Sequence, residues 1–105
     1  MGIEIVSYRK YEKNTLRGFV TVRMTNIGVE IKDITIHEKG GKQWVGLPAK
    51  QVKDKDGEVV YLPLIEFYDS KSREQFRSAV LDALDIWRNN QIFDDPQMGV
   101  FRSVL

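Results

Sequence analysis

An aromatic residue flanked by arginines is the feature of this sequence whose chemistry is easiest to name. Arg17, Phe19 and Arg23 fall on alternating positions of the segment 16–24, and alternating side chains of a β-strand point to the same face. Arginines contact phosphates, and an aromatic ring stacks on a base with a contribution of roughly 1–3 kcal/mol. Exposed apolar surface also marks protein interfaces. The alternative is therefore that Phe19 is buried in a dimer interface or under the chain's C-terminal tail, with the arginines at the rim.

A second group of cations lies at the start of a predicted helix. Lys71, Arg73 and Arg77 occupy its first two turns, where the helix dipole disfavours each cation by a few tenths of a kcal/mol. Arg73 and Arg77 are also like charges four residues apart, which adds a small penalty. A bound phosphate would offset both costs, and pairing with Asp69 and Glu74 is the alternative. Three lysines of the neighbouring hairpin would enlarge either basic surface: Lys50, Lys53 and Lys55.

The residues needed for catalysis or metal binding are missing from the sequence. There is no cysteine, and His37 is the only histidine, at a predicted strand end where a solvated side chain is the ordinary case. Asp54 and Asp56 alternate with lysines, which is typical of a hairpin tip. No phosphate-binding glycine motif occurs, and Gly40-Gly41 is typical of a plain turn. The sequence predicts a non-catalytic protein without metal or cofactor.

The charge is distributed unevenly along the chain. Its 105 residues fit one domain and carry a net charge of +1, but residues 1–55 have eleven Lys and Arg against six Asp and Glu, and residues 56–105 have five against nine. The two halves therefore carry +5 and −4. Such a split indicates either a basic binding surface or two halves that attract each other within or between chains. The sequence shows no secretory signal and no apolar run near the roughly 20 residues of a membrane span, so we expect a soluble, cytoplasmic protein.

The first two-thirds of the sequence predict short antiparallel strands. Alternation of apolar and polar residues with a period of two is typical of strands, and glycine- or asparagine-containing turns separate them. Between residues 29 and 37 the alternation changes phase, which predicts a β-bulge near Lys32-Asp33. Pro48 marks the end or an edge of its strand. Five strands are expected, at 3–11, 16–24, 29–37, 43–49 and 58–67.

A helix and an apolar tail complete the expected α+β fold, a single domain with the sheet in 1–68, the helix in 69–90 and the tail in 91–105. Asp69 or Ser70 can cap the helix, and Asn89-Asn90 are expected to end it. One face of this helix carries apolar residues at a period of 3.6: Phe76, Val80, Ala83, Leu84 and Trp87. The tail is too apolar for a solvated terminus and is expected to pack on the sheet, on the helix or on a second chain.

Several segments, in order, resemble the stage V sporulation protein G (SpoVG) family. The apolar strand 29–36 precedes Trp44-Val45-Gly46-Leu47-Pro48-Ala49-Lys50, which is similar to the family's hallmark of valine, a small residue, Met or Leu, proline, a small residue and a basic one. The Asp56-Gly57 hairpin, Pro63 and the amphipathic helix follow in the family's order. The resemblance covers roughly residues 3–88.

The resemblance implies a bacterial regulator of gene expression that binds DNA or RNA. Members are named for effects on sporulation and septation, and form small homodimers by strand exchange or sheet pairing. It places nucleic-acid contacts near the helix start, at Arg73. The alternative is a structural module that binds a protein partner through its exposed sheet face and apolar tail. The candidate nucleic-acid-binding residues are Arg17, Phe19, Arg23, Lys50, Lys53, Lys71, Arg73 and Arg77.

Overall fold

The computed structural model describes residues 2–93 and, for residues 91–93, the backbone only. Four antiparallel strands form one sheet in the order β1 (Ile3–Lys13), β2 (Leu16–Met24), β3 (Val29–Lys39) and β4 (Lys42–Gly46). Strands β5 (Ala49–Lys53) and β6 (Val59–Pro63) form a separate two-stranded sheet, and helix α1 (Ser70–Phe93) follows. The expected α+β architecture with antiparallel pairing is therefore confirmed. The predicted tail, 94–105 and the side chains of 91–93, lies outside the part described.

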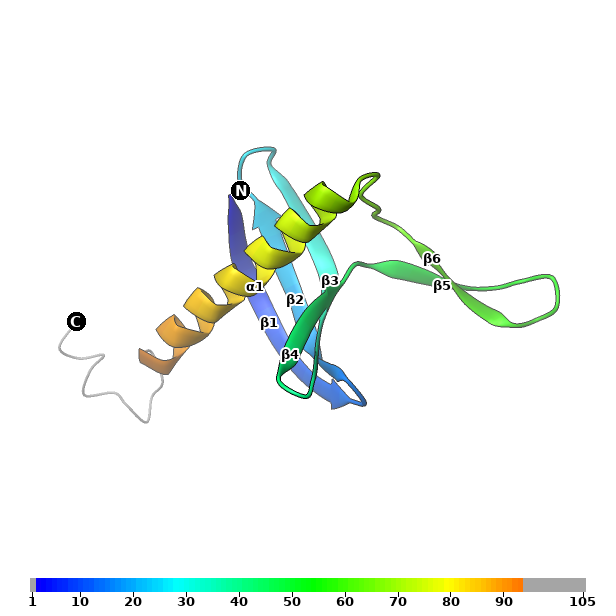
Figure 1. Ribbon diagram of the computed structural model, residues 1–105, viewed down its shortest axis with the longest axis horizontal. Helices are drawn as coiled ribbons and strands as arrows, with labels where there is room; N and C mark the ends of the chain where they lie inside the picture. The colour runs from blue at the N-terminus through cyan, green and yellow to red at the C-terminus, as the bar shows by residue number, and fades with distance from the viewer. Residues whose placement is uncertain (1, 94–105) are drawn as a thin grey trace.

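Helix α1 lies diagonally across one face of the four-stranded sheet (Figure 1). The helix residues Phe76, Val80 and Leu84 are buried, as their spacing predicts, and Ala83 and Trp87 are half-buried on the same side. They pack on six buried side chains of the sheet: Val20, Val22, Ile31, Ile34, Ile36 and Val45. The core lies between helix and sheet, and in the described residues no second layer covers the opposite face of the sheet, called here the outer face.

The bulge predicted in β3 is present. Val20 pairs with Ile34 and Val22 with Ile31, so β3 has one residue more than β2 between these pairs. Asp33 takes a left-handed φ of 61°, which aspartate tolerates better than most residues. The extra residue returns Ile31 and Ile34 to the buried face, and this explains the change of phase in the sequence.

The structure has six strands rather than the five expected, because the predicted strand 43–49 divides at Leu47-Pro48. Its first part, β4, pairs with β3, and its second part, β5, pairs with β6. Proline lacks the N–H that a sheet ladder needs, so the chain leaves the main sheet there. The last strand is shorter than the predicted 58–67, because β6 ends at Pro63.

Strands β5 and β6 form an arm that extends away from the body (Figure 1). The Cα radius of gyration is 16.4 Å, whereas a compact domain of this length has about 12–13 Å. At the tip, the Asp54 carboxylate accepts hydrogen bonds from the backbone N–H groups of Asp56 and Glu58, both at 2.9 Å. Asp54 and Asp56 therefore lie at a hairpin tip, as predicted, and the Asp54 carboxylate shapes its turn.

The helix begins as expected and ends later. The Asp69 carboxylate accepts a hydrogen bond from the backbone N–H of Ser72 at 2.7 Å and one from its hydroxyl at 3.0 Å, so Asp69 is the cap. The predicted end at Asn89-Asn90 is wrong: α1 continues to Phe93. An asparagine ends a helix by taking a left-handed φ, and neither Asn89 nor Asn90 does so. Over the described residues, no helix is both long and apolar enough to cross a membrane.

Candidate nucleic-acid interface

A row of side chains crosses the outer face of the sheet at Phe19. Arg9 on β1 pairs with Phe19 on β2, Phe19 with Thr35 on β3, and Thr35 with Gly46 on β4. Residues directly opposite each other in antiparallel strands interact side by side. The Arg9 guanidinium carbon lies 4.8 Å from the centre of the Phe19 ring, within the range of a cation–π contact. The cation beside Phe19 is therefore Arg9, which the sequence analysis did not select.

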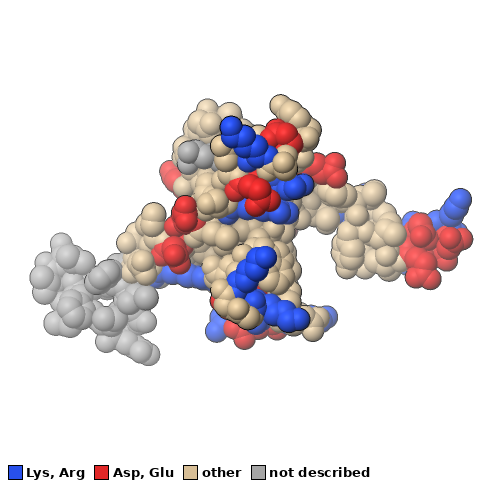
Figure 2. All heavy atoms as spheres, in the orientation of Figure 1, with Lys and Arg blue, Asp and Glu red and all other residues tan. Residues whose placement is uncertain are grey.

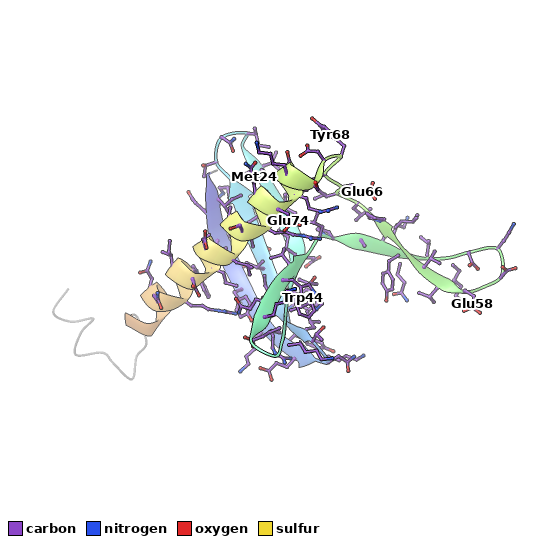
Figure 3. All side chains as sticks on the ribbon, viewed as in Figure 1. Met24, Trp44, Glu58, Glu66, Tyr68 and Glu74 are labelled. Carbon is purple, nitrogen blue, oxygen red and sulfur yellow. The ribbon has the colours of Figure 1, made fainter. Side chains whose placement is uncertain are left out.

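Two aromatic pairs flank this row. Tyr11 and Phe19 have ring centres 6.0 Å apart at a tilt of 52°, and His37 and Trp44 stack almost in parallel, with centres 5.5 Å apart and planes 5° apart. Trp44 lies midway along β4 (Figure 3). The exposed fractions of Tyr11 and Trp44 are 51% and 36%. Aromatic surface thus reaches solvent at both edges of the sheet.

Hydrogen bonds fix the ring of His37. Its Nδ1 lies 3.1 Å from the Thr15 hydroxyl, and its Nε2 lies 3.0 Å from the Thr35 hydroxyl. Burial lowers the pKa of His37 below its ordinary value, so the neutral ring predominates at pH 7. His37 is thus a packed ring held against Trp44, whereas the sequence suggested a solvated strand end.

Contrary to the prediction, Arg17 does not lie on the same face of the sheet as Phe19. A register shift between Leu16 and Gly18 leaves Arg17 as an extra residue in β2. Its Nε lies 3.8 Å from a Glu38 carboxylate oxygen, and its side chain lines a groove with Tyr8 and the helix residue Arg88. The bulge therefore directs Arg17 toward the helix side of the sheet.

Arg23 keeps the predicted face, but it has a carboxylate partner. Its guanidinium donates a hydrogen bond to Glu30 at 2.7 Å, and Glu4 is its cross-strand partner on β1. The Glu30 hydrogen bond, the Glu30 charge and the Glu4 charge each raise the pKa of Arg23. Two carboxylates flank one cation here, so this end of the outer face offers no excess positive charge.

The opposite end of the sheet is strongly basic. The basic end, defined as residues 9–17 and 37–42, contains six Lys and Arg and two Glu, a net charge of +4 with His37 neutral. Figure 2 shows these blue side chains gathered at the lower end of the molecule. Glu12 pairs with Lys10 and Glu38 with Arg17. Within residues 2–93, four cations of this end have no ion-pair partner: Arg9, Lys13, Lys39 and Lys42.

Arg73 and Arg77 come together at the helix start, as the sequence predicts. Both line a cleft of about 440 Å³ with apolar walls that include Leu47 and Phe67. Both also lie beside Glu74, with nitrogen–oxygen distances of 3.7 Å for Arg73 and 3.3 Å for Arg77. Of the two local pairings considered from the sequence, the one with Glu74 is present, whereas Asp69 caps the helix instead. The Nε atoms of both arginines are shielded from solvent and have no hydrogen-bond partner among the described residues.

Carboxylates balance the cations of the helix start. Glu66 lines the same cleft, Asp69 caps the helix, and Glu74 pairs with both arginines (Figure 3). These three carboxylates equal the three cations Lys71, Arg73 and Arg77 in number. The exposed Lys50 and Lys53 lie on β5 of the arm, opposite Leu62 and Val59, so Lys50 is near the body and Lys53 near the tip.

Sequence reasoning missed four residues of the outer face: Arg9, Tyr11, His37 and Trp44. Two signals were available. In the expected strand 3–11, Arg9 and Tyr11 are two residues apart and therefore share a face. The Gly40-Gly41 hairpin brings His37 and Trp44 opposite each other. The register of β1 on β2 was not available, because two irregularities interrupt it.

No protein-family model matches the chain, and no curated protein matches it significantly. Among the described residues, no three His, Cys, Asp or Glu side chains cluster as a metal site would require.

Proposed function

We propose that this chain is a non-catalytic DNA- or RNA-binding protein that regulates bacterial gene expression in the cytoplasm, and that phosphate contacts dominate its affinity. The observation that carries the proposal is the net charge of +4 at the basic end, next to exposed aromatic rings. The sequence resemblance to the SpoVG family supports the same class of function and a link to sporulation and septation.

Phosphate binding at the basic end follows from the excess of six cations over two carboxylates there. Arg9, Lys13, Lys39 and Lys42 are exposed and without ion-pair partners among residues 2–93. Each cation that neutralises a phosphate releases condensed counterions, so the logarithm of the affinity falls with the logarithm of salt, with a slope of about −0.7 to −0.9 per contact. Four contacts give a slope of roughly −3 to −4.

The helix start is the second contact surface in the proposal. Its charge is balanced, but Arg73 and Arg77 line one cleft, and the Nε of each has no hydrogen-bond partner among the described residues. A phosphate oxygen there would compete with Glu74 for both guanidinium groups. Lys50 and Lys71 lie at exposed positions on the elements that border this cleft, whereas Lys53 contributes only if nucleic acid reaches along the arm.

A salt titration tests the proposal. Fluorescence anisotropy with labelled single- and double-stranded DNA and RNA of mixed sequence, at 25 and 200 mM salt, is expected to show binding that weakens by roughly two to three orders of magnitude at the higher salt. Absence of binding to all four at 25 mM salt would refute the proposed function.

A homodimer is the second part of the proposal, and the apolar arm supports it. Four residues of the arm and its exit are apolar and largely exposed, with exposed fractions of 48% to 67%: Val59, Tyr61, Leu62 and Leu64. Two-stranded hairpins are marginally stable alone, and pairing of two arms would bury these side chains. The proposed dimer therefore forms by sheet pairing between the arms of two subunits.

Light scattering after size exclusion measures the mass of the particle. We expect a dimer for the native chain and a monomer for Leu62→Glu. Ile86→Glu is the matched control, since Ile86 is also largely exposed, at 63% against 51% for Leu62, but lies on the helix. A native monomer at 100 µM would refute the dimer. A heterologous protein partner is the alternative role for the same apolar surface.

A further inference from the structure

The outer face combines features that suit single-stranded nucleic acid better than duplex. Its lower end carries the stacked pair His37–Trp44, the pair Tyr11–Phe19, and Arg9 against Phe19. Bases of a duplex are already stacked on each other, and their faces are not accessible. Unpaired bases stack on aromatic side chains and on guanidinium planes.

The rings are held in place before any ligand binds. Thr15 and Thr35 hold His37, and His37 in turn lies parallel to Trp44. A Cβ added at Gly46 would collide with the Thr35 hydroxyl and come within 3.4 Å of His37 Nε2. The row therefore needs a glycine beside Thr35. Because the rings are already held in place, little side-chain entropy is lost when a base stacks on them.

A hollow beside Phe19 offers a place for a base. It has a volume of about 500 Å³, and the sheet residues Arg9, Phe19 and Thr35 line it together with Leu47, which precedes the arm, and Tyr61, the middle residue of β6. Its size is within the range of small-ligand sites. Asp33 also lines it, and its carboxylate can accept a hydrogen bond from the amino group of a base.

The charge around the face fits a polyanion. Arg9, Lys13, Lys39 and Lys42 lie in the basic end that surrounds the rings, whose net charge is +4. A protein interface would instead have charges depleted around its aromatic centre. Cations beside flat rings provide the two kinds of contact that a single strand needs, one to phosphates and one to bases.

From this placement we infer that the outer face, with Tyr11, Phe19, His37 and Trp44, is a stacking surface that binds unpaired bases and gives the protein a preference for single-stranded nucleic acid. The inference rests on the proposed function and adds to it the form of the nucleic acid and the residues that select it.

The tryptophans allow a direct test. The chain has two, Trp44 on this face and Trp87 against the core. In a Trp87→Phe variant, Trp44 alone reports on the outer face. Titration with a 12-nucleotide single strand is expected to quench Trp44 emission with the same midpoint as the anisotropy change of the labelled strand. A duplex of the same sequence is expected to bind more weakly and to leave the emission unchanged.

Paired substitutions separate ring stacking from apolar burial. Tyr11→Leu and Trp44→Leu each remove a ring and are expected to weaken single-strand binding by about 5- to 150-fold, whereas Tyr11→Phe and Trp44→Phe keep a ring and most of the affinity. Tyr68→Leu is the control, because Tyr68 is fully exposed away from this face. Duplex affinity is expected to change less than twofold in all five.

The outcomes distinguish this inference from the function on which it rests. Salt-dependent binding without Trp44 quenching, and with unaffected Leu variants, would overturn the stacking surface and leave the proposed function intact. A change in particle mass on Tyr11→Leu, measured without nucleic acid, would identify the face as an interface between copies and overturn it too. Absence of any binding at low salt would overturn both.

Discussion

The basic end of the sheet and the start of the helix differ in how their cations are compensated. At the helix start, three cations face three carboxylates, and Glu74 alone lies beside both Arg73 and Arg77. At the sheet end, six cations face two carboxylates. The sequence draws attention to the first region because its cations oppose the helix dipole. The structure shows that compensation by carboxylates decides which region has positive charge left for a ligand.

The largest expected difference between the two regions is in affinity for nucleic acid. Lys39→Gln with Lys42→Gln removes two exposed cations without ion-pair partners among residues 2–93, one on each side of the Gly40-Gly41 turn. We expect the salt slope to fall by about 1.4 to 1.8 and the affinity at 100 mM salt to fall at least tenfold. Anisotropy titrations at four salt concentrations measure both quantities.

Arg73→Gln with Arg77→Gln is the matched double variant. Because Glu74 and Glu66 already compensate these arginines, we expect less than half of the change in slope. A larger effect here than at Lys39 and Lys42 would reverse the comparison and make the helix start the main phosphate site, as the family resemblance implies. Thermal unfolding of both double variants checks that each remains folded.

Removal of one carboxylate from each region has the next largest effect. Glu38→Gln releases Arg17, and Glu74→Gln releases Arg73 and Arg77. Each variant adds one positive charge, and we expect affinity to rise by about three- to eightfold for a released cation that reaches a phosphate. The region with the larger gain, by anisotropy at fixed salt, is the one in closer contact with the backbone.

The smallest effect concerns pH, and only the sheet end contains a histidine. Burial lowers the pKa of His37 below its ordinary value of 6.5, so the folded chain binds this proton less readily than the unfolded chain. Its contribution to stability is complete above about pH 6.5 and is lost as pH falls through the lower pKa of the folded state.

Melting temperatures between pH 7.5 and 5 measure this loss. We expect a small decline for the native chain, in excess of that for His37→Gln, which keeps hydrogen-bonding groups but does not titrate. Equal declines would show that His37 is not the group responsible. Arg73→Gln with Arg77→Gln is expected to leave the pH dependence unchanged.

Local patterns predicted much of the fold. The change of phase before Asp33 located the β3 bulge, and the spacing of Phe76, Val80 and Leu84 identified the buried helix face. Asp56-Gly57 and Gly40-Gly41 located turns that take left-handed φ at their glycines. Each of these features is determined within a few residues, which is the range over which sequence patterns are informative.

Features that depend on partners distant in sequence were not predictable. The bulge at Arg17 causes no change in the apolar alternation, because Gly18 occupies the position where a buried side chain would reveal it. Pro48 marked a strand end, but only tertiary structure decides that the chain then begins a second sheet. The pairing of Arg9 with Phe19 requires the β1–β2 register, and this explains why the sequence did not place Arg9 beside Phe19.

The separation of the arm from the body at Leu47-Pro48 has a consequence for local unfolding. Only Val52 of the β5–β6 strand residues is even half-buried, so the arm gains little from the hydrophobic core and its amide hydrogens should exchange with solvent before those of β2 and β3. Self-association through the arm would slow that exchange as protein concentration rises. Hydrogen exchange measured over a dilution series would then report assembly through the ten residues of β5 and β6. The exchange rates of the amide hydrogens in β2 and β3 would not depend on protein concentration.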